Sequence, residues 1–353
     1  MPANTSCADH RSSESPCHLG KTLNWMLRHH SCHSVERGLR SCPPTQVGCA
    51  CAYQANACQA VCHGSQHDGE VHDREAAVNG ATPAGQGLTL MAVHAHPDDE
   101  AIGTGGVLAR YSAEGVRTVL VTCTNGEQGD DNGGVKPGGD GHRPAEVAAR
   151  RLAELRRSVE VLGVSALELL GYRDSGMDGW AANNEPDVFC NVAIGDASER
   201  VAALMRRYRP QVVVTYDENG GYGHPDHIQT HRATLAAAEA TGIPEKVYYS
   251  AFPKSAFAEM RRRLEEVGVN VEELGLSGDF GVADELITTT VDVSRYVGRK
   301  RDALFAHESQ SDNFGPFAKL PEEVVMEGIS SEWFTLRGSP AGTAEDDLFA
   351  GLR

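Results

Sequence analysis

The sequence LTLMAVHAHPDDE occupies residues 88–100 and decides the fold class. Its first eight residues, 88–95, are mostly apolar and end at a polar cluster, as a buried strand of a parallel sheet does. Residues 101–114 have the composition of a helix, and RTVLVTC at 117–123 has the pattern of a second strand. This strand–helix–strand order predicts a βαβ unit and therefore a parallel sheet.

The same alternation continues along the chain. Its clearest strand is QVVVTY at 211–216, where β-branched residues form an unbroken run. The segment 128–141 is rich in Gly and Asp and interrupts the alternation, as loops over active sites often do. Further helices are expected at 145–162, 198–208, 226–240 and 255–267, and further strands at 166–170, 246–252 and 287–293.

These elements predict an α/β fold: a Rossmann-like, mostly parallel sheet with helices on both faces. We expect the sheet to end with the strand near 287–293 and the next helix to open at Ser294, a residue type favoured at helix N-caps. The predicted domain spans residues 88–353.

The segment before it, residues 1–87, has a different character. Eight of the ten cysteines lie in its first 62 residues, and it shows no sustained helix or strand periodicity. Three interpretations stay open: a disordered tail, a start codon assigned too early, or a Cys/His metal module. The spacing of Cys49, Cys51, Cys58 and Cys62 does not match paired zinc-finger knuckles, so the first two are preferred.

The formal net charge of −17 opposes binding to phosphate backbones. The basic clusters at 156–157 and 261–263 lie on amphipathic helical patterns, where a solvated face is the simpler interpretation, so no nucleic-acid partner is expected. The first 30 residues lack the apolar core of a signal peptide, and no run is long enough to span a bilayer. We expect a soluble, cytoplasmic protein with reduced thiols and no membrane partner; a homo-oligomer stays open.

Two polar clusters carry the chemistry. The first is HPDDE at 96–100, where acidic groups crowd together and a divalent metal would relieve their repulsion. The second is GGYGHPDH at 220–227, just past the fourth strand. In a doubly wound sheet of order 3-2-1-4 the first and fourth strands are neighbours, so both clusters flank one crevice. Two histidines and a carboxylate would leave an open metal position, as in catalytic zinc sites.

Other residues receive simpler interpretations. His94 and His307 are expected to be hydrogen-bonded structural residues, and His231, one helical turn after His227, is a weaker metal candidate. The glycines in GTGG at 103–106 lack the full dinucleotide-binding fingerprint and follow carboxylates that would repel a pyrophosphate. A nucleotide cofactor is therefore not expected.

The segments AHPDDE (95–100) and TYDENGGYGHPDHIQTH (215–231) resemble the signatures of the LmbE-like or PIG-L deacetylase superfamily. Within it, the chain is most similar to the mycothiol-pathway enzymes, the N-acetylglucosaminyl-inositol deacetylases and the mycothiol S-conjugate amidases. The resemblance covers residues 88–353 and leaves out the Cys-rich segment.

The resemblance implies a zinc site and a base. His96, Asp99 and His227 would bind Zn²⁺, and Fe²⁺ suits the same ligands. Asp98 would be the general base that takes a proton from water and returns it to the leaving amine.

Three further residues of the second motif would act on the substrate carbonyl. His224 would stabilise the oxyanion or serve as an acid, with Asp226 tuning its charge, and Tyr222 would close over the carbonyl.

Arg151 and Asp174 stand where the mycothiol-pathway deacetylases hold substrate hydroxyls, and Asp130 replaces a glutamate of that family. The amidases have a lysine near the position of Gly103 and Thr104, so one conjugate-specific contact is missing here.

The leading prediction is a zinc-dependent hydrolase that removes the N-acetyl group from an N-acetylglucosamine-containing small molecule. One alternative is an amidase that cleaves mycothiol S-conjugates. The other is a metal-bound sugar-binding protein without turnover, which is disfavoured because Asp98 and His224 are both present and binding alone requires neither.

Overall fold

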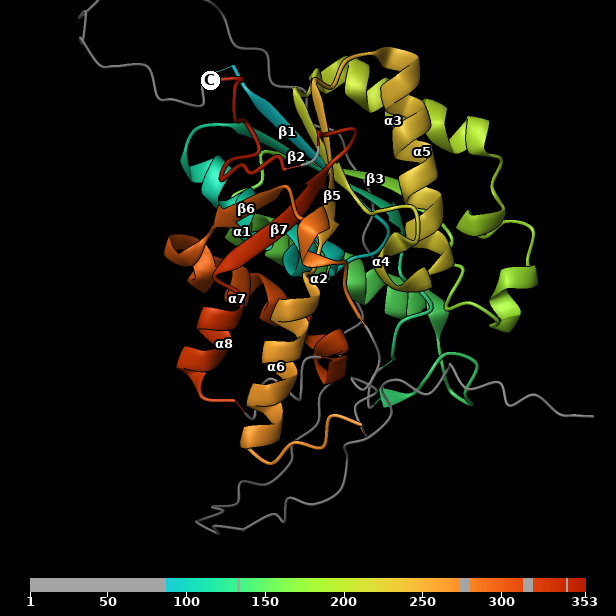
Figure 1. Ribbon diagram of the computed structural model, residues 1–353. Coiled ribbons are helices and arrows are strands. Elements are labelled where there is room, and N and C mark those ends of the chain that lie inside the picture. The colour runs from blue at the N-terminus through green and yellow to red at the C-terminus, as the bar shows by residue number, and fades with distance from the viewer. Residues whose placement is uncertain (1–86, 132–133, 273–279, 314–319, 341) are drawn as a thin grey trace, which may run out of the picture. The chain divides into compact units, whose positions relative to one another are not determined.

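The computed structural model describes residues 87–131, 134–272, 280–313, 320–340 and 342–353 (Figure 1). The Cys/His-rich segment predicted over 1–87 therefore lies outside the described residues, apart from Gly87. Among the helices in the described ranges, none is long and apolar enough to cross a membrane.

The described residues form a seven-stranded sheet with the order β3-β2-β1-β4-β5-β7-β6. All pairings from β3 through β5 are parallel, whereas β7 runs antiparallel to both β5 and β6. The predicted α/β fold with a mostly parallel sheet is confirmed. The strands are β1 Thr89–His94, β2 Arg117–Thr124, β3 Ala166–Tyr172, β4 Val212–Thr215, β5 Lys246–Ala251, β6 Thr289–Asp292 and β7 Ser331–Leu336.

Helices cover both faces of the sheet, with α3 and α5 lying together on one side (Figure 1). The other face packs against α1, α2 and α7. The predicted helices are present with shifts of a few residues at their ends. They are α1 Asp99–Ala113, α2 Pro144–Leu162, α3 Ile194–Tyr208, α5 Pro225–Thr241, α6 Lys254–Glu266 and α7 Val297–Ala306. The helices α4 Gly220–Gly223 and α8 Glu322–Gly328 were not predicted.

Strand β1 lies at the centre of the core, and all six of its residues are buried. Leu90 and Ala92 pack into the cluster beneath α1 and α2, whereas Met91 and Val93 pack into the cluster beneath α3 and α5. A strand that is buried on both faces has no polar face, so it appears in the sequence as a continuous apolar run.

The sheet does not end at 287–293, and this prediction was wrong. The additional strand β7 inserts between β5 and β6. Its residue Glu332 is only 3% exposed and accepts hydrogen bonds from the backbone N–H groups of Gly106 and Val107 in α1. The buried ammonium of Lys300 lies 2.7 Å from the same carboxylate. Because the charged residue Glu332 occupies a buried position in this strand, the apolar pattern by which strands are predicted is interrupted.

Ser294 is not the N-cap of the following helix, so that prediction was also wrong. It begins a short 3₁₀ turn, Ser294–Tyr296, and α7 begins after it at Val297. The backbone N–H of Ser294 donates to the Asp292 carboxylate at 2.8 Å. Asp292 therefore satisfies the backbone group that a cap would normally satisfy.

The predicted switch point lies between β1 and β4. These strands pair in parallel register, with Leu90 opposite Val212 and Ala92 opposite Val214. Both polar clusters follow the carboxyl ends of these two strands, so the topology brings them to the same edge of the sheet.

Candidate metal centre and catalytic site

Three of the predicted residues place donor atoms in a nearly equilateral triangle. His96 Nδ1 lies 3.3 Å from Asp99 Oδ2, and His227 Nε2 lies 3.4 Å from the same oxygen and 3.3 Å from His96 Nδ1. Donors at about 2.0–2.1 Å from a tetrahedral zinc ion are separated by about 3.3–3.4 Å. The described residues therefore contain a His/Asp group, with two buried histidines and a partly buried aspartate, whose spacing fits a metal ion.

The local fold explains how the two motifs meet. His96 follows β1, and its backbone N–H donates to Asp99 Oδ2 at 2.8 Å, which fixes Asp99 at the start of α1. His227 lies in the first turn of α5, where its Nδ1 contacts the Gly220 carbonyl at 3.1 Å. A Cβ at Gly220 would lie 2.6 Å from His227 Cβ, so only glycine permits this approach.

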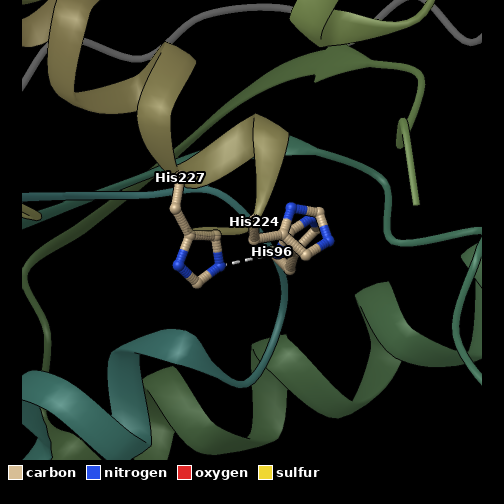
Figure 2. A group of neighbouring side chains, drawn as sticks. All are labelled: His96, His224 and His227. Carbon is tan, nitrogen blue, oxygen red and sulfur yellow. Dashed lines mark hydrogen bonds between the residues drawn. The ribbon is translucent and has the colours of Figure 1, made fainter. Parts of the chain in front are cut away.

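His224 lies beside these two histidines (Figure 2). It is the N-cap of α5, and its Nδ1 accepts the backbone N–H of Asp226 at 3.1 Å. Because Nδ1 is an acceptor, a neutral His224 carries its proton on Nε2. Burial, followed by the nearby charges of His96 and His227, lowers the pKa of His224 well below its usual value. His224 is therefore a neutral hydrogen-bond donor.

The expected role of Asp226 differs from its observed position. Its carboxylate lies 3.2 Å from His96 Nε2, whereas only its backbone contacts His224. Ser175 donates to this carboxylate from both its backbone N–H, at 2.9 Å, and its hydroxyl. A carboxylate in this position holds the orientation of the His96 ring and leaves its other nitrogen, Nδ1, available to a metal ion.

Two other groups of buried donors are close enough to hold an ion. One is the three histidines of Figure 2, and the other is His96 with Asp174 and Asp226. In the second group both carboxylates already accept backbone N–H groups, Asp174 from Gly176 at 2.8 Å and Asp226 from Ser175. In the first group the Nδ1 of His224 already accepts the Asp226 backbone N–H, and the Nε2 of the neutral ring carries the proton. Asp99 Oδ2 also accepts two hydrogen bonds, from the His96 N–H and the Tyr216 hydroxyl, so all three donor groups are candidates for holding a metal ion.

Asp98 lies next to this triangle in an unusual backbone conformation. Its φ angle is 115°, which costs a residue with a side chain about 1–3 kcal/mol. Burial raises the pKa of the Asp98 carboxyl to about 6; Arg151 opposes this shift and Asp99 adds to it. A carboxylate with a pKa near neutrality suits a general base.

Arg151 is more deeply engaged than a substrate contact requires. It is 5% exposed, and its guanidinium donates to the Pro97 carbonyl at 2.6 Å and the Gly126 carbonyl at 2.7 Å. It also pairs with Asp98 at 3.2 Å. A Cβ at Gly126 or Gly129 would lie 2.7 Å from its terminal nitrogen, so these glycines make room for it. Arg151 braces two loops of the site.

The remaining predicted residues line the surroundings of the triangle. Asp174 is 3% exposed and lies 3.5 Å from His96 Nε2. Burial alone would raise the pKa of Asp174, but the nearby positive charges of His96 and Arg151 outweigh it and lower this pKa. Asp130 pairs with Lys136. Tyr222 is 53% exposed, and its ring meets His227 edge-on with centroids 5.0 Å apart. Its exposure leaves Tyr222 free to contact a bound molecule.

Tyr216 is an important residue that sequence reasoning missed. Its hydroxyl donates to Asp99 Oδ2 at 2.7 Å and accepts the Ala95 N–H at 2.9 Å. Burial and the neighbouring Asp99 raise the pKa of Tyr216, which keeps this hydroxyl protonated. The only sequence signal was its position at the end of the fourth strand, directly before the second polar cluster.

The other three histidines make hydrogen-bond contacts outside the donor triangle. His94 Nε2 lies 2.9 Å from the Thr104 hydroxyl, and its Nδ1 lies 3.3 Å from the Tyr216 hydroxyl. His307 bonds to Glu100, and His231 Nδ1 contacts the Tyr216 carbonyl at 2.8 Å. His231 therefore supports the strand end and lies outside the donor triangle.

The fold thus gathers histidines and carboxylates that could hold a metal ion at the carboxyl ends of β1 and β4. The chain belongs to the GlcNAc-PI de-N-acetylase (PIG-L) family, whose model matches residues 91–238. The resemblance noted in the sequence is thereby confirmed.

Curated relatives match most of the chain. One is the 1D-myo-inositol 2-acetamido-2-deoxy-alpha-D-glucopyranoside deacetylase of Acidothermus cellulolyticus, which is 42% identical over 277 residues, covering 75% of this chain and 95% of the relative. The protein of the same name from Geodermatophilus obscurus is 40% identical over 289 residues, covering 74% and 97%. Among solved structures, the N,N'-diacetylchitobiose deacetylase from Pyrococcus horikoshii aligns with a TM-score of 0.46 and 21% identity, covering 70% of this chain and 83% of that one.

Proposed function

We propose that this protein is a zinc-dependent deacetylase whose substrate is an N-acetylglucosaminide of inositol. The donor triangle beside Asp98 carries the proposal, because it joins a metal site to a carboxylate of raised pKa. The names of relatives at 40–42% identity supply the substrate class. Residues 88–353 form the proposed catalytic domain, which agrees with the 74–75% of the chain that these relatives match.

His96, Asp99 and His227 would hold the zinc ion, and Fe²⁺ suits the same donors. When bound, the metal supplies Lewis acidity to the attacking water and to the acetamide carbonyl. The protein's own contribution is to place a base, a hydrogen-bond donor and the substrate around that position.

Asp98 is the proposed base. Its carboxylate accepts a proton from the water that attacks the acetyl carbon, and it returns that proton to the amine nitrogen as the carbon–nitrogen bond breaks. The products are acetate and the free amino sugar. Arg151 holds the Asp98 carboxylate at 3.2 Å, so the base keeps a fixed direction through both transfers.

His224 is the proposed donor to the carbonyl oxygen as negative charge develops there. Its Nε2–H is free to do so because its Nδ1 is occupied by the Asp226 backbone. Tyr222, which is half-exposed beside His227, would cover the carbonyl from the solvent side. Asp174, Asp130 and Arg151 would contact the sugar and polyol hydroxyls.

The cytoplasm is the proposed compartment, since the two cysteines of the described chain, Cys123 and Cys190, are both free thiols.

The test is acetate release from N-acetylglucosaminyl-inositol and simple N-acetylglucosaminides by the full chain, with and without a chelator. Asp98→Asn is the matched variant, since it keeps the side chain's shape and removes its basicity. We expect release that requires metal and is lost in the variant. Bound zinc without acetate release from any substrate would refute the deacetylase. Release of an acetylcysteine product from thiol conjugates would then identify an amidase instead.

A further inference from the structure

Glu100 and His307 form a fully buried pair beneath the proposed base. Both residues are 0% exposed, and His307 Nε2 lies 2.7 Å from Glu100 Oε1 although 207 residues separate them. The hydroxyl of Ser158 donates to the same oxygen. Among the described atoms, His307 Nδ1 has no hydrogen-bond partner, so its contact with Glu100 is the polar contact that holds the ring.

The other oxygen of Glu100 holds the backbone of Asp98. Glu100 Oε2 accepts the Asp98 N–H at 3.0 Å, at the residue whose φ angle is 115°. A positive φ in an aspartate persists only when surrounding contacts enforce it. This conformation directs the Asp98 side chain toward Arg151, which it meets at 3.2 Å. Through this hydrogen bond to the backbone, Glu100 fixes the direction of the Asp98 side chain.

The segment that carries His307 also contacts two other parts of the site. The backbone N–H and hydroxyl of Ser309 donate to Glu154 at 2.9 and 2.7 Å. The Gln310 amide donates to the Asp130 carbonyl at 3.3 Å and accepts the Asp130 N–H at 3.4 Å. Residues 307–310 lie outside the 91–238 range that the family model matches. The C-terminal part of the chain thus contacts several residues that surround the site.

We propose that His307 is a positioning residue that acts through Glu100 to hold Asp98 in its working direction. The inference rests on the proposed function, because it assigns Asp98 the role of base. The hydrogen bonds that connect His307 to Asp98 run through the Glu100 carboxylate and the Asp98 backbone N–H, in addition to the electrostatic interaction between the two residues. Removing His307 leaves Ser158 as the hydrogen-bond donor to that oxygen of Glu100, so the carboxylate can shift and the Asp98 backbone can relax.

The experiment compares the full-length protein with His307→Leu and His307→Gln. Leucine removes the donor to Glu100, whereas the amide of glutamine can replace it. We expect His307→Leu to lose about 100-fold in kcat, the order expected when a catalytic group is misplaced by about 1 Å. KM and zinc content should stay at the wild-type values, and His307→Gln should recover most of the lost rate.

Lys300→Met is the matched control. Lys300 belongs to another buried ion pair, with Glu332 at 2.7 Å, and it lies on the helix that leads into His307. Its loss should lower the melting temperature and leave kcat unchanged in the folded protein. If His307→Leu keeps its kcat, or if both variants lose rate in step with their melting temperatures, the positioning role is wrong.

A wild-type protein that releases no acetate would remove the proposed function without deciding this inference. Crystal structures of the wild type and both His307 variants then provide the test. The inference requires Asp98 to leave its positive φ in His307→Leu and to keep it in His307→Gln. An unchanged Asp98 φ in His307→Leu would overturn it.

Discussion

The ring of Tyr216 stacks on the imidazole of His227, with centroids 4.1 Å apart and planes inclined by only 17°. The same side chain donates its hydroxyl to Asp99 at 2.7 Å. Tyr216, which directly follows β4, thus orients two of the three proposed metal ligands: His227 by ring packing and Asp99 by a hydrogen bond. Partners of this kind commonly change metal affinity by about 10–100-fold.

Tyr216→Phe should keep the stacking and lose the hydrogen bond to Asp99. We expect its affinity for zinc to fall by about tenfold, the lower end of the effect of outer partners. Competition with a chromogenic chelator measures this directly. Tyr248→Phe is the control, because Tyr248 is a buried tyrosine whose hydroxyl contacts Glu345 and the Leu348 carbonyl, away from the donor triangle. Equal zinc affinity in both variants would contradict the role of Tyr216.

The pH dependence of turnover should follow Asp98. Its pKa is raised to about 6, and only the carboxylate form can accept a proton. Activity is therefore present above this pKa and is lost as the pH falls through it. We expect kcat/KM to decrease by about tenfold per pH unit below about pH 6, as a single titrating base requires. A profile that stays flat down to pH 4.5 in metal-saturated protein would exclude Asp98 as the base.

Arg151→Met should move that acidic limb to higher pH. The guanidinium favours the ionised form of Asp98, so its removal raises the Asp98 pKa further. The variant also loses the braces to the Pro97 and Gly126 carbonyls, so a lower kcat is expected at every pH. Titration of kcat/KM beside the wild type measures the shift. A limb that moves to lower pH would show that Arg151 does not stabilise the carboxylate.

The buried pair of Glu332 and Lys300 should dominate the stability of the C-terminal strand. Glu332→Leu leaves Lys300 buried without its partner and removes the acceptor of the Gly106 and Val107 N–H groups. Breaking one side of a buried pair costs about 3–5 kcal/mol. Denaturant unfolding should show a loss of that size. The double variant Lys300→Met/Glu332→Leu should be more stable than Glu332→Leu alone, and a strictly additive loss would contradict the pairing.

The parts of the fold that were predictable share one property. Strands β1, β2 and β4 are buried on both faces, so their apolar runs are continuous, and the βα alternation sets their order. Strand β7 was missed because SEWFTL mixes a buried glutamate with partly exposed residues. Its carboxylate is satisfied by α1 and Lys300, which are partners that local sequence does not reveal.

The residues of the candidate site likewise differ in how well the sequence predicts them. The residues that crowd charge within a few positions, such as Asp98, Asp99 and His227, carry a local signal. His307 carries none, and Tyr216 has only its position at the end of a predicted strand, because each acquires its role from a contact across more than 100 residues. Asp226 was assigned to its sequence neighbour His224, yet the fold turns its carboxylate toward His96. Spacing predicts which side chains can be near one another, and packing decides which of them touch.

The insertion of β7 between β5 and β6 has a consequence for biosynthesis. During translation β5 is made before β6 and β7. In the sheet that the structure describes, the second edge of β5 pairs with β7, so that partner is absent until residues 331–336 have emerged from the ribosome. Until then β5 presents an open edge, which is the feature by which partly made chains associate. The same strand supplies Glu332 to the first helix, 226 residues earlier. The domain therefore cannot complete its fold until nearly its whole length has been translated. We expect chaperones to bind mainly to chains that are stalled between β5 and β7.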